Sequence, residues 1–177
     1  MAIKTASGSD LRNSLSSGLV LLNTTTFSGV ASQSINNVFS ATYANYRIVL
    51  NITALSSSTS LNFKMRKAGV DSTSTAYRGA YWSILGGTQT ITGNDATDNA
   101  RFSKTTANGY ANFVMDVFTP FSGTASSIYG YGVYSSTSDR EIAAFGYALP
   151  LDAFDGFSIV PGAGTTTGTV RVYGYNN

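Results

Sequence analysis

The chain contains neither cysteine nor histidine among its 177 residues. Without cysteine there are no disulfides, and without both residue types there are no zinc sites of the usual Cys/His kind. The same absence removes the Ser-His-Asp and Cys-His catalytic arrangements, together with the commonest general base. We therefore expect a protein that is not an enzyme and that uses no cofactor or metal.

Charge is also scarce. Charged residues make up 11% of the chain, against about 25% in typical proteins. The formal net charge is only +2, and the basic residues are scattered from Lys4 to Arg171, which argues against nucleic acid as a partner. No apolar run approaches the roughly 20 residues that cross a bilayer, so we expect no membrane partner. The segment Met1–Ser7 has one cation and no apolar core, so a signal peptide is not expected.

The chain is rich in residues that favour β-strands. It has 11 Tyr and 10 Phe, and its polar residues are mainly Ser, Thr, Asn and Gly, which form turns. The expected strands cover residues 19–22, 34–39, 46–53, 61–66, 80–85, 110–117, 128–134, 142–147, 157–160 and 169–175. Short strands without intervening long helices predict an all-β fold, a β-sandwich or jelly roll of about eight to ten antiparallel strands.

Alternation within the strands predicts which side chains form the core. In 61–66, apolar residues alternate with Asn62, Lys64 and Arg66, which we expect to face solvent. The predicted core residues are Ile48, Leu50, Phe63, Met65, Phe113 and Met115. Residues 67–79 and 93–99 are interpreted as loops, and residues 149–154 as a possible single helical turn.

Residues 1–18 differ from the rest and are interpreted as an N-terminal arm, with residues 19–177 as one β-sandwich domain. Ser9 or Asp10 could cap a short helix that carries Leu11 and Leu15 on one face. A helix this short is unstable alone. The segment is therefore either a frayed leader or an arm that orders on a partner. Our hypothesis is the second, with Ile3, Leu11 and Leu15 as the assembly residues.

Three acidic pairs were considered as sites. Asp139 and Glu141 flank Arg140 in an expected turn, and Asp152 and Asp155 bracket a short apolar segment. Asp95 and Asp98 lie in an oxygen-rich loop that lacks the spacing of a calcium loop. We assign none of these pairs a catalytic or metal-binding role.

Trp82, with Tyr77 and Tyr81, forms a possible aromatic contact surface, because such rings offer large rigid contact area with a polar tip. Neighbouring residues of a strand face opposite sides, so one of Tyr81 and Trp82 is expected in the core. We favour the core position for Trp82.

The segments Phe39–Leu50 (FSATYANYRIVL) and Gly168–Tyr175 (GTVRVYGY), together with the opening at residues 19–26, resemble small virion proteins of tailed bacteriophages. The resemblance spans most of residues 19–177. It implies a β-sandwich or jelly-roll module, often trimeric, that decorates capsids, caps vertices or tips tail fibres. It carries no catalytic residue over to this chain.

The resemblance makes a capsid decoration or cement subunit the leading hypothesis, located in the virion, with other capsid or tail proteins as partners and a homotrimer as the expected oligomer. The alternative is a receptor-binding tip of a tail or fibre that binds host surface polysaccharide. A free carbohydrate-active jelly-roll enzyme is a third interpretation, which the lack of histidine and the scattered acids disfavour.

Overall fold

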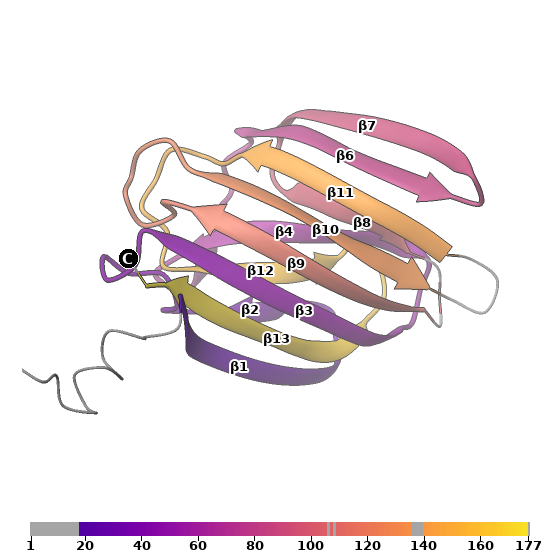
Figure 1. Ribbon diagram of the computed structural model, residues 1–177, viewed down its shortest axis with the longest axis horizontal. Helices are drawn as coiled ribbons and strands as arrows, with labels where there is room; N and C mark the ends of the chain where they lie inside the picture. Colours follow the sequence, from indigo (N-terminus) through magenta and orange to yellow (C-terminus); the bar gives the residue numbers. More distant parts are fainter. Residues whose placement is uncertain (1–17, 106, 108, 136–139, 177) are drawn as a thin grey trace, which may run out of the picture.

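The structure, a computed structural model, describes residues 18–105, 107, 109–135 and 140–176. Within these ranges the strands pair antiparallel and form two sheets, which pack against each other as two layers (Figure 1). The predicted all-β sandwich is therefore confirmed. The same ranges contain no helix, and hence none long and apolar enough to cross a membrane.

The larger sheet has eight strands in the order β1-β13-β3-β9-β10-β11-β6-β7. Most pairs of neighbouring strands in this sheet are not consecutive in the chain, so most pairings join segments that are distant in sequence. The bounds in that order are Leu19–Val30, Thr166–Tyr175, Asn45–Leu55, Tyr110–Phe118, Ser127–Ser135, Arg140–Ala148, Tyr77–Leu85 and Thr88–Thr97.

The smaller sheet has five strands and lies against the inner face of the larger one. Its path is β2-β12-β4-β5, and β8 pairs with β4 as well. The bounds are Gln33–Ile35 for β2, Gly156–Pro161 for β12, Thr59–Lys67 for β4, Val70–Asp71 for β5 and Ala100–Thr105 for β8. β8 also approaches β6, β10 and β11 of the larger sheet, so it closes one side of the sandwich.

The core lies between the two sheets. The residues predicted for it are all at most 1% exposed: Ile48, Leu50, Phe63, Met65, Phe113 and Met115. Phe63 and Phe157 of the smaller sheet stack at 4.9 Å between ring centroids. Phe102 of the smaller sheet lies edge-on to Phe113 of the larger sheet at 5.1 Å and so joins the two layers. The alternating pattern therefore predicted the inner faces of β3, β4 and β9 correctly.

The described residues form thirteen strands, more than predicted, because three lie in segments interpreted as loops or left unassigned. β5 falls within 67–79, and β7 includes most of 93–99. In β7, Thr88, Thr90 and Thr92 pair with β6 across the two-residue turn Gly86–Gly87, so a hairpin makes a strand of a polar, glycine-containing segment.

The predicted helical turn at 149–154 is wrong. The backbone N–H groups of Leu149 and Phe154 donate to the carbonyls of Ser126 and Pro120, at 3.0 and 2.8 Å. The segment is therefore bonded to the loop between β9 and β10 and not within itself as a helix would be.

The two ends of the described chain lie side by side, because β1 pairs with β13 and the Asn176 N–H donates to the Gly18 carbonyl at 3.1 Å. The assembly residues Ile3, Leu11 and Leu15 lie outside the described residues. The division into an arm of residues 1–18 and a domain of residues 19–177 therefore stays a prediction.

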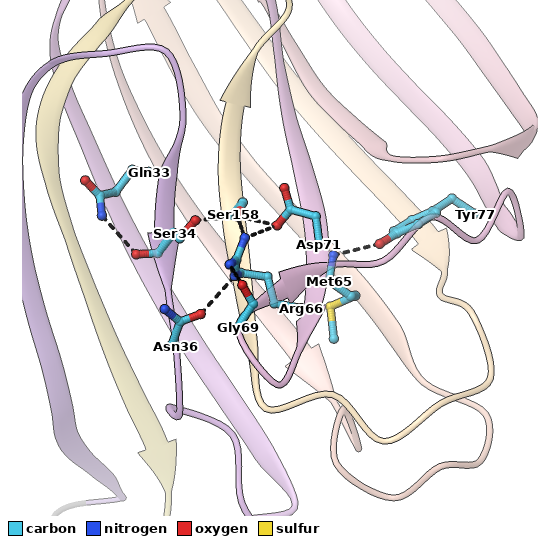
Figure 2. A network of polar contacts seen from close by, with 9 residues as sticks. All are labelled: Gln33, Ser34, Asn36, Met65, Arg66, Gly69, Asp71, Tyr77 and Ser158. Atoms are coloured by element: carbon cyan, nitrogen blue, oxygen red, sulfur yellow. Dashed lines mark hydrogen bonds and ion pairs between the residues drawn. The ribbon is translucent and has the colours of Figure 1, made fainter.

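The outer face of the five-stranded sheet carries a hydrogen-bonded network centred on Arg66 (Figure 2). Arg66 faces outward as predicted, but it is only 9% exposed. Its guanidinium donates to Asn36 Oδ1 at 2.9 Å and to Ser158 Oγ at 3.0 Å, and it also contacts the Asp71 carboxylate and the Gly69 carbonyl. Ser158 in turn donates to Asp71 at 2.7 Å. Arg66 is thus a structural residue rather than a solvated one.

Candidate functional site: the outer face of the eight-stranded sheet

The aromatic residues proposed as one contact surface lie on two sides of β6. Tyr77 and Tyr81 point into the sandwich and are at most 2% exposed, and Tyr77 Oη accepts a hydrogen bond from the Met65 N–H at 2.7 Å. Trp82 lies on the outer face and is partly exposed. The core position favoured for Trp82 is therefore wrong, and Tyr77 and Tyr81 are not part of an exposed surface.

Trp82 instead belongs to an apolar strip on the side of the eight-stranded sheet that faces away from the smaller sheet. The strand register places Val49, Val114, Tyr131, Ala144, Trp82 and Ile91 in one row across six strands. A second row contains Val133, Ile142 and Ile84. We call these nine residues the apolar outer face. Because side chains in adjacent strands are about 5 Å apart, the rows form one continuous surface.

The centre of the apolar outer face is open to solvent. Tyr131, Val133 and Ile142 are 61%, 48% and 56% exposed. A shallow hollow of about 310 Å³ lies between them and Val49 and Val114, with mostly apolar walls. Large exposed apolar patches on a soluble protein usually mark a binding surface.

The sequence of β10 explains how the aromatic residues come to face outward. In Tyr129-Gly130-Tyr131-Gly132 the tyrosines face solvent and the glycines face the core. A Cβ at Gly132 would lie 2.3 Å from the Phe113 ring, and one at Gly130 would lie 2.7 Å from the Phe145 ring. The core rings from neighbouring strands therefore occupy the space under β10, which leaves the β10 tyrosines on the outside.

A neutralised charge cluster borders the apolar outer face. Arg47 binds Asp116 through two hydrogen bonds of 2.9 and 2.8 Å, and Tyr175 donates to the same carboxylate at 2.6 Å. Burial alone would raise the pKa of Asp116, but the hydrogen bonds from Arg47 and Tyr175 outweigh it and lower the pKa. Burial and the neighbouring Asp116 raise the pKa of Tyr175 to about 12. The cluster stays ion-paired near neutral pH and adds no net charge to this face.

The acidic residues considered from the sequence mostly have partners within the fold. Asp95 pairs with Arg78 at 3.3 Å, Asp98 with Lys64 at 2.6 Å, and Asp152 with Lys67 at 2.7 Å. Asp155 accepts from the Ala68 N–H at 2.8 Å. Asp139 lies outside the described residues. Glu141 lies on β11 and is buried on the inner side of the eight-stranded sheet. Across the ranges that the structure describes, no three acidic side chains gather as metal ligands would.

Tyr131, Val133 and Ile142 were not predicted as surface residues. The alternation of tyrosine and glycine in β10 was the available signal, since two glycines on one side of a strand leave room for neighbouring rings and place the aromatic side chains opposite. The fold and this face define an antiparallel β-sandwich with an exposed apolar surface. Comparison with family models, curated proteins and solved structures found no match.

Proposed function

We propose that this chain is a structural subunit of a protein assembly and that the apolar outer face is where one copy contacts another. The observation that carries the proposal is the exposure of Tyr131, Val133 and Ile142 at the centre of a continuous apolar surface. Interface centres are depleted in charge and enriched in aromatic residues, and the nine residues of this face include no charged side chain.

The size of the sheet supports a protein partner. Eight strands about 4.8 Å apart, each about nine residues long at about 3.3 Å per residue, present roughly 1,000 Å². A stable interface buries about 800 Å² on each partner. An area of this size is enough for contact with another subunit, so a second copy of this chain is the occupant that we propose.

The test is the mass of the full chain in solution at micromolar concentration, measured by sedimentation or light scattering. We expect an oligomer, and the resemblance to virion proteins favours a trimer. Ile142→Glu should produce a monomer because it places a charge in the desolvated centre of the contact. Leu151→Glu is the matched control, because Leu151 is 74% exposed but lies in a loop away from this face. A monomeric wild type, or an unchanged mass for Ile142→Glu, would refute the proposal.

The narrower proposal is that the assembly is a bacteriophage virion, in which the chain serves as a capsid decoration or cement subunit. The sequence resemblance in 39–50 and 168–175 supports it, as does a fold that offers a broad contact surface. We expect purified phage heads to retain the protein stoichiometrically, and imaging of intact particles to locate it on the capsid. Absence from the heads would contradict this narrower proposal without affecting self-association.

The alternative, a receptor-binding tip, has one observation in its favour. Tyr129 and Tyr131 are 48% and 61% exposed on the same sheet as Trp82, and exposed aromatic rings can stack on sugars. Binding to polysaccharide arrays without retention on heads would favour the tip.

A further inference from the structure

A second feature lies on the opposite, inner side of the eight-stranded sheet, near its β7 edge. It is a cavity of about 220 Å³, with polar and apolar walls, between β6, β7 and β11 of the larger sheet and β8 of the smaller one. Its polar wall consists of Tyr81, Ser83, Thr90, Thr92, Arg101 and Glu141. None of these six residues belongs to the apolar outer face.

The strand register gathers the hydroxyl groups. Tyr81 is paired with Thr92 across β6 and β7, and Ser83 is paired with Thr90. Paired residues of adjacent strands point to the same side of a sheet, so the three short hydroxyl side chains line one wall beside the phenol. Glu141 adds a carboxyl group from β11, opposite Leu85 of β6.

Two polar atoms in this cavity are buried without a hydrogen bond. Tyr81 is 2% exposed, and its Oη has no partner among the described residues. The same holds for Nε of Arg101, whose guanidinium lies over the Tyr81 ring at 5.4 Å from the centroid. Buried polar groups are nearly always hydrogen-bonded, because leaving them unpaired is costly. The Tyr81 hydroxyl and the Arg101 Nε, left unpaired beside a cavity, therefore point to a ligand.

Glu141 is the third polar group at the cavity. It is 3% exposed, and the described residues place no cation within ion-pairing distance of it. Burial raises its pKa to about 7. Near neutral pH the carboxyl group therefore exists in both forms and can either donate or accept a hydrogen bond.

We propose that this cavity binds a neutral polyhydroxyl ligand, a single sugar unit. Each sugar hydroxyl both donates and accepts, which matches a wall that combines the fixed donor Arg101, the carboxyl of Glu141 and several hydroxyl groups that can do either. A free anion fits less well, because Glu141 becomes negative in the same cavity as pH rises. The volume is below the roughly 300–1,000 Å³ of pockets for drug-sized ligands, which is consistent with one sugar unit.

The test uses the full-length chain and a small panel of probes. Glucose, galactose, mannose and N-acetylglucosamine are titrated at millimolar concentrations by isothermal calorimetry and by amide chemical-shift mapping. Glycine and sulfate serve as the zwitterionic and anionic probes. We expect saturable binding of at least one monosaccharide, with shifts at Tyr81, Thr92 and Glu141, and no saturation with glycine or sulfate.

Tyr81→Phe is the decisive variant because it removes only the unpaired hydroxyl. We expect sugar affinity to fall about tenfold, which is the loss of one hydrogen bond to the ligand. The free variant should melt at a higher temperature than the wild type, because a buried unpaired hydroxyl is gone. Tyr110→Phe is the matched control, since Tyr110 is 51% exposed and remote from the cavity, and it should bind like the wild type.

Thr92→Val, which keeps the side-chain volume, is the second variant and should also weaken sugar binding. The proposal is overturned if no monosaccharide saturates, if only glycine or sulfate binds, or if both variants bind sugar as well as the wild type. These outcomes are independent of self-association, which is measured on Ile142→Glu and depends on the other face of the sheet.

Discussion

The outer faces of the two sheets differ in the contacts that their side chains make. On the five-stranded sheet, Arg66 is nearly buried by its own neighbours, and its donors are taken up by Asn36, Asp71 and Ser158 (Figure 2). On the eight-stranded sheet, the central residues are apolar and exposed, as Tyr131 and Ile142 show. A network of this kind is complete within one chain, whereas an exposed apolar strip is covered only by a partner. The contrast shows a structural network on one face and is the basis of the contact that we propose for the other.

The largest expected effect concerns the hydrophobic core between the two sheets. Phe113→Ala should lower the free energy of unfolding by about 3–5 kcal/mol, because it leaves a cavity where Phe113 packs on Phe102. Phe63→Ala should cost a similar amount on the five-stranded side. Chemical denaturation with both variants measures this, and an unchanged midpoint would mean that these rings do not form the common core.

Glu141 gives the next largest effect, and its sign follows from the direction of its pKa shift. The pKa in the folded state is about 7 instead of the ordinary 4.5, so between these values the unfolded state releases the proton more readily. Stability should therefore fall as pH rises from about 4.5 to 7, by on the order of 3 kcal/mol. Glu141→Gln should flatten this slope in pH-dependent denaturation. Parallel curves for wild type and variant would show that Glu141 is not buried as described.

The network on the five-stranded sheet can be broken at its centre. Arg66→Met should lower the free energy of unfolding by about 2 kcal/mol, because Asp71 and Ser158 lose their shared donor while water can still reach part of Asp71. Arg171→Met is the matched control, since Arg171 is an exposed arginine on the outer side of the eight-stranded sheet. It should change stability by less than about 0.5 kcal/mol. Equal effects of the two variants would remove the contrast between the faces.

The smallest expected effect on stability belongs to Ile142, at the centre of the proposed contact. Ile142→Glu should leave the thermal unfolding of the monomer nearly unchanged, within about 0.5 kcal/mol, because the side chain is already half exposed. If this variant unfolds like Phe113→Ala, then Ile142 is a core residue and the proposed contact face is wrong.

The inner faces of β3, β4 and β9 were predictable because their largest apolar residues recur at every second position. Ile48, Leu50 and Phe113 are each flanked by polar or smaller residues, so one side of the strand is plainly the apolar one. β7 was not predictable, because its threonines and glycine are typical of a loop and only the ladder with β6 makes them a strand. A segment without clear alternation becomes a strand through its pairing, here across the two-residue turn Gly86–Gly87.

The candidate sites were harder to predict than the fold. Trp82 and Tyr81 alternate like core and surface, but both sides of β6 carry large apolar residues, so the pattern does not say which side is inside. The contact between Arg101 and Tyr81 joins residues from different sheets, and the cavity beside Glu141 depends on four strands. No short segment contains that information.

By itself the sequence determined that the chain is all-β, that it has no cysteine or histidine chemistry, and which residues of its clearest strands are buried. These properties follow from composition and from the two-residue period of a strand, both of which are local. Only the tertiary structure decided that Trp82 faces outward, that Arg66 is enclosed, and that Tyr81, Arg101 and Glu141 meet around one cavity. Those outcomes depend on strand order and register, and register places every side chain of a strand on one face or the other according to partners far away in the chain.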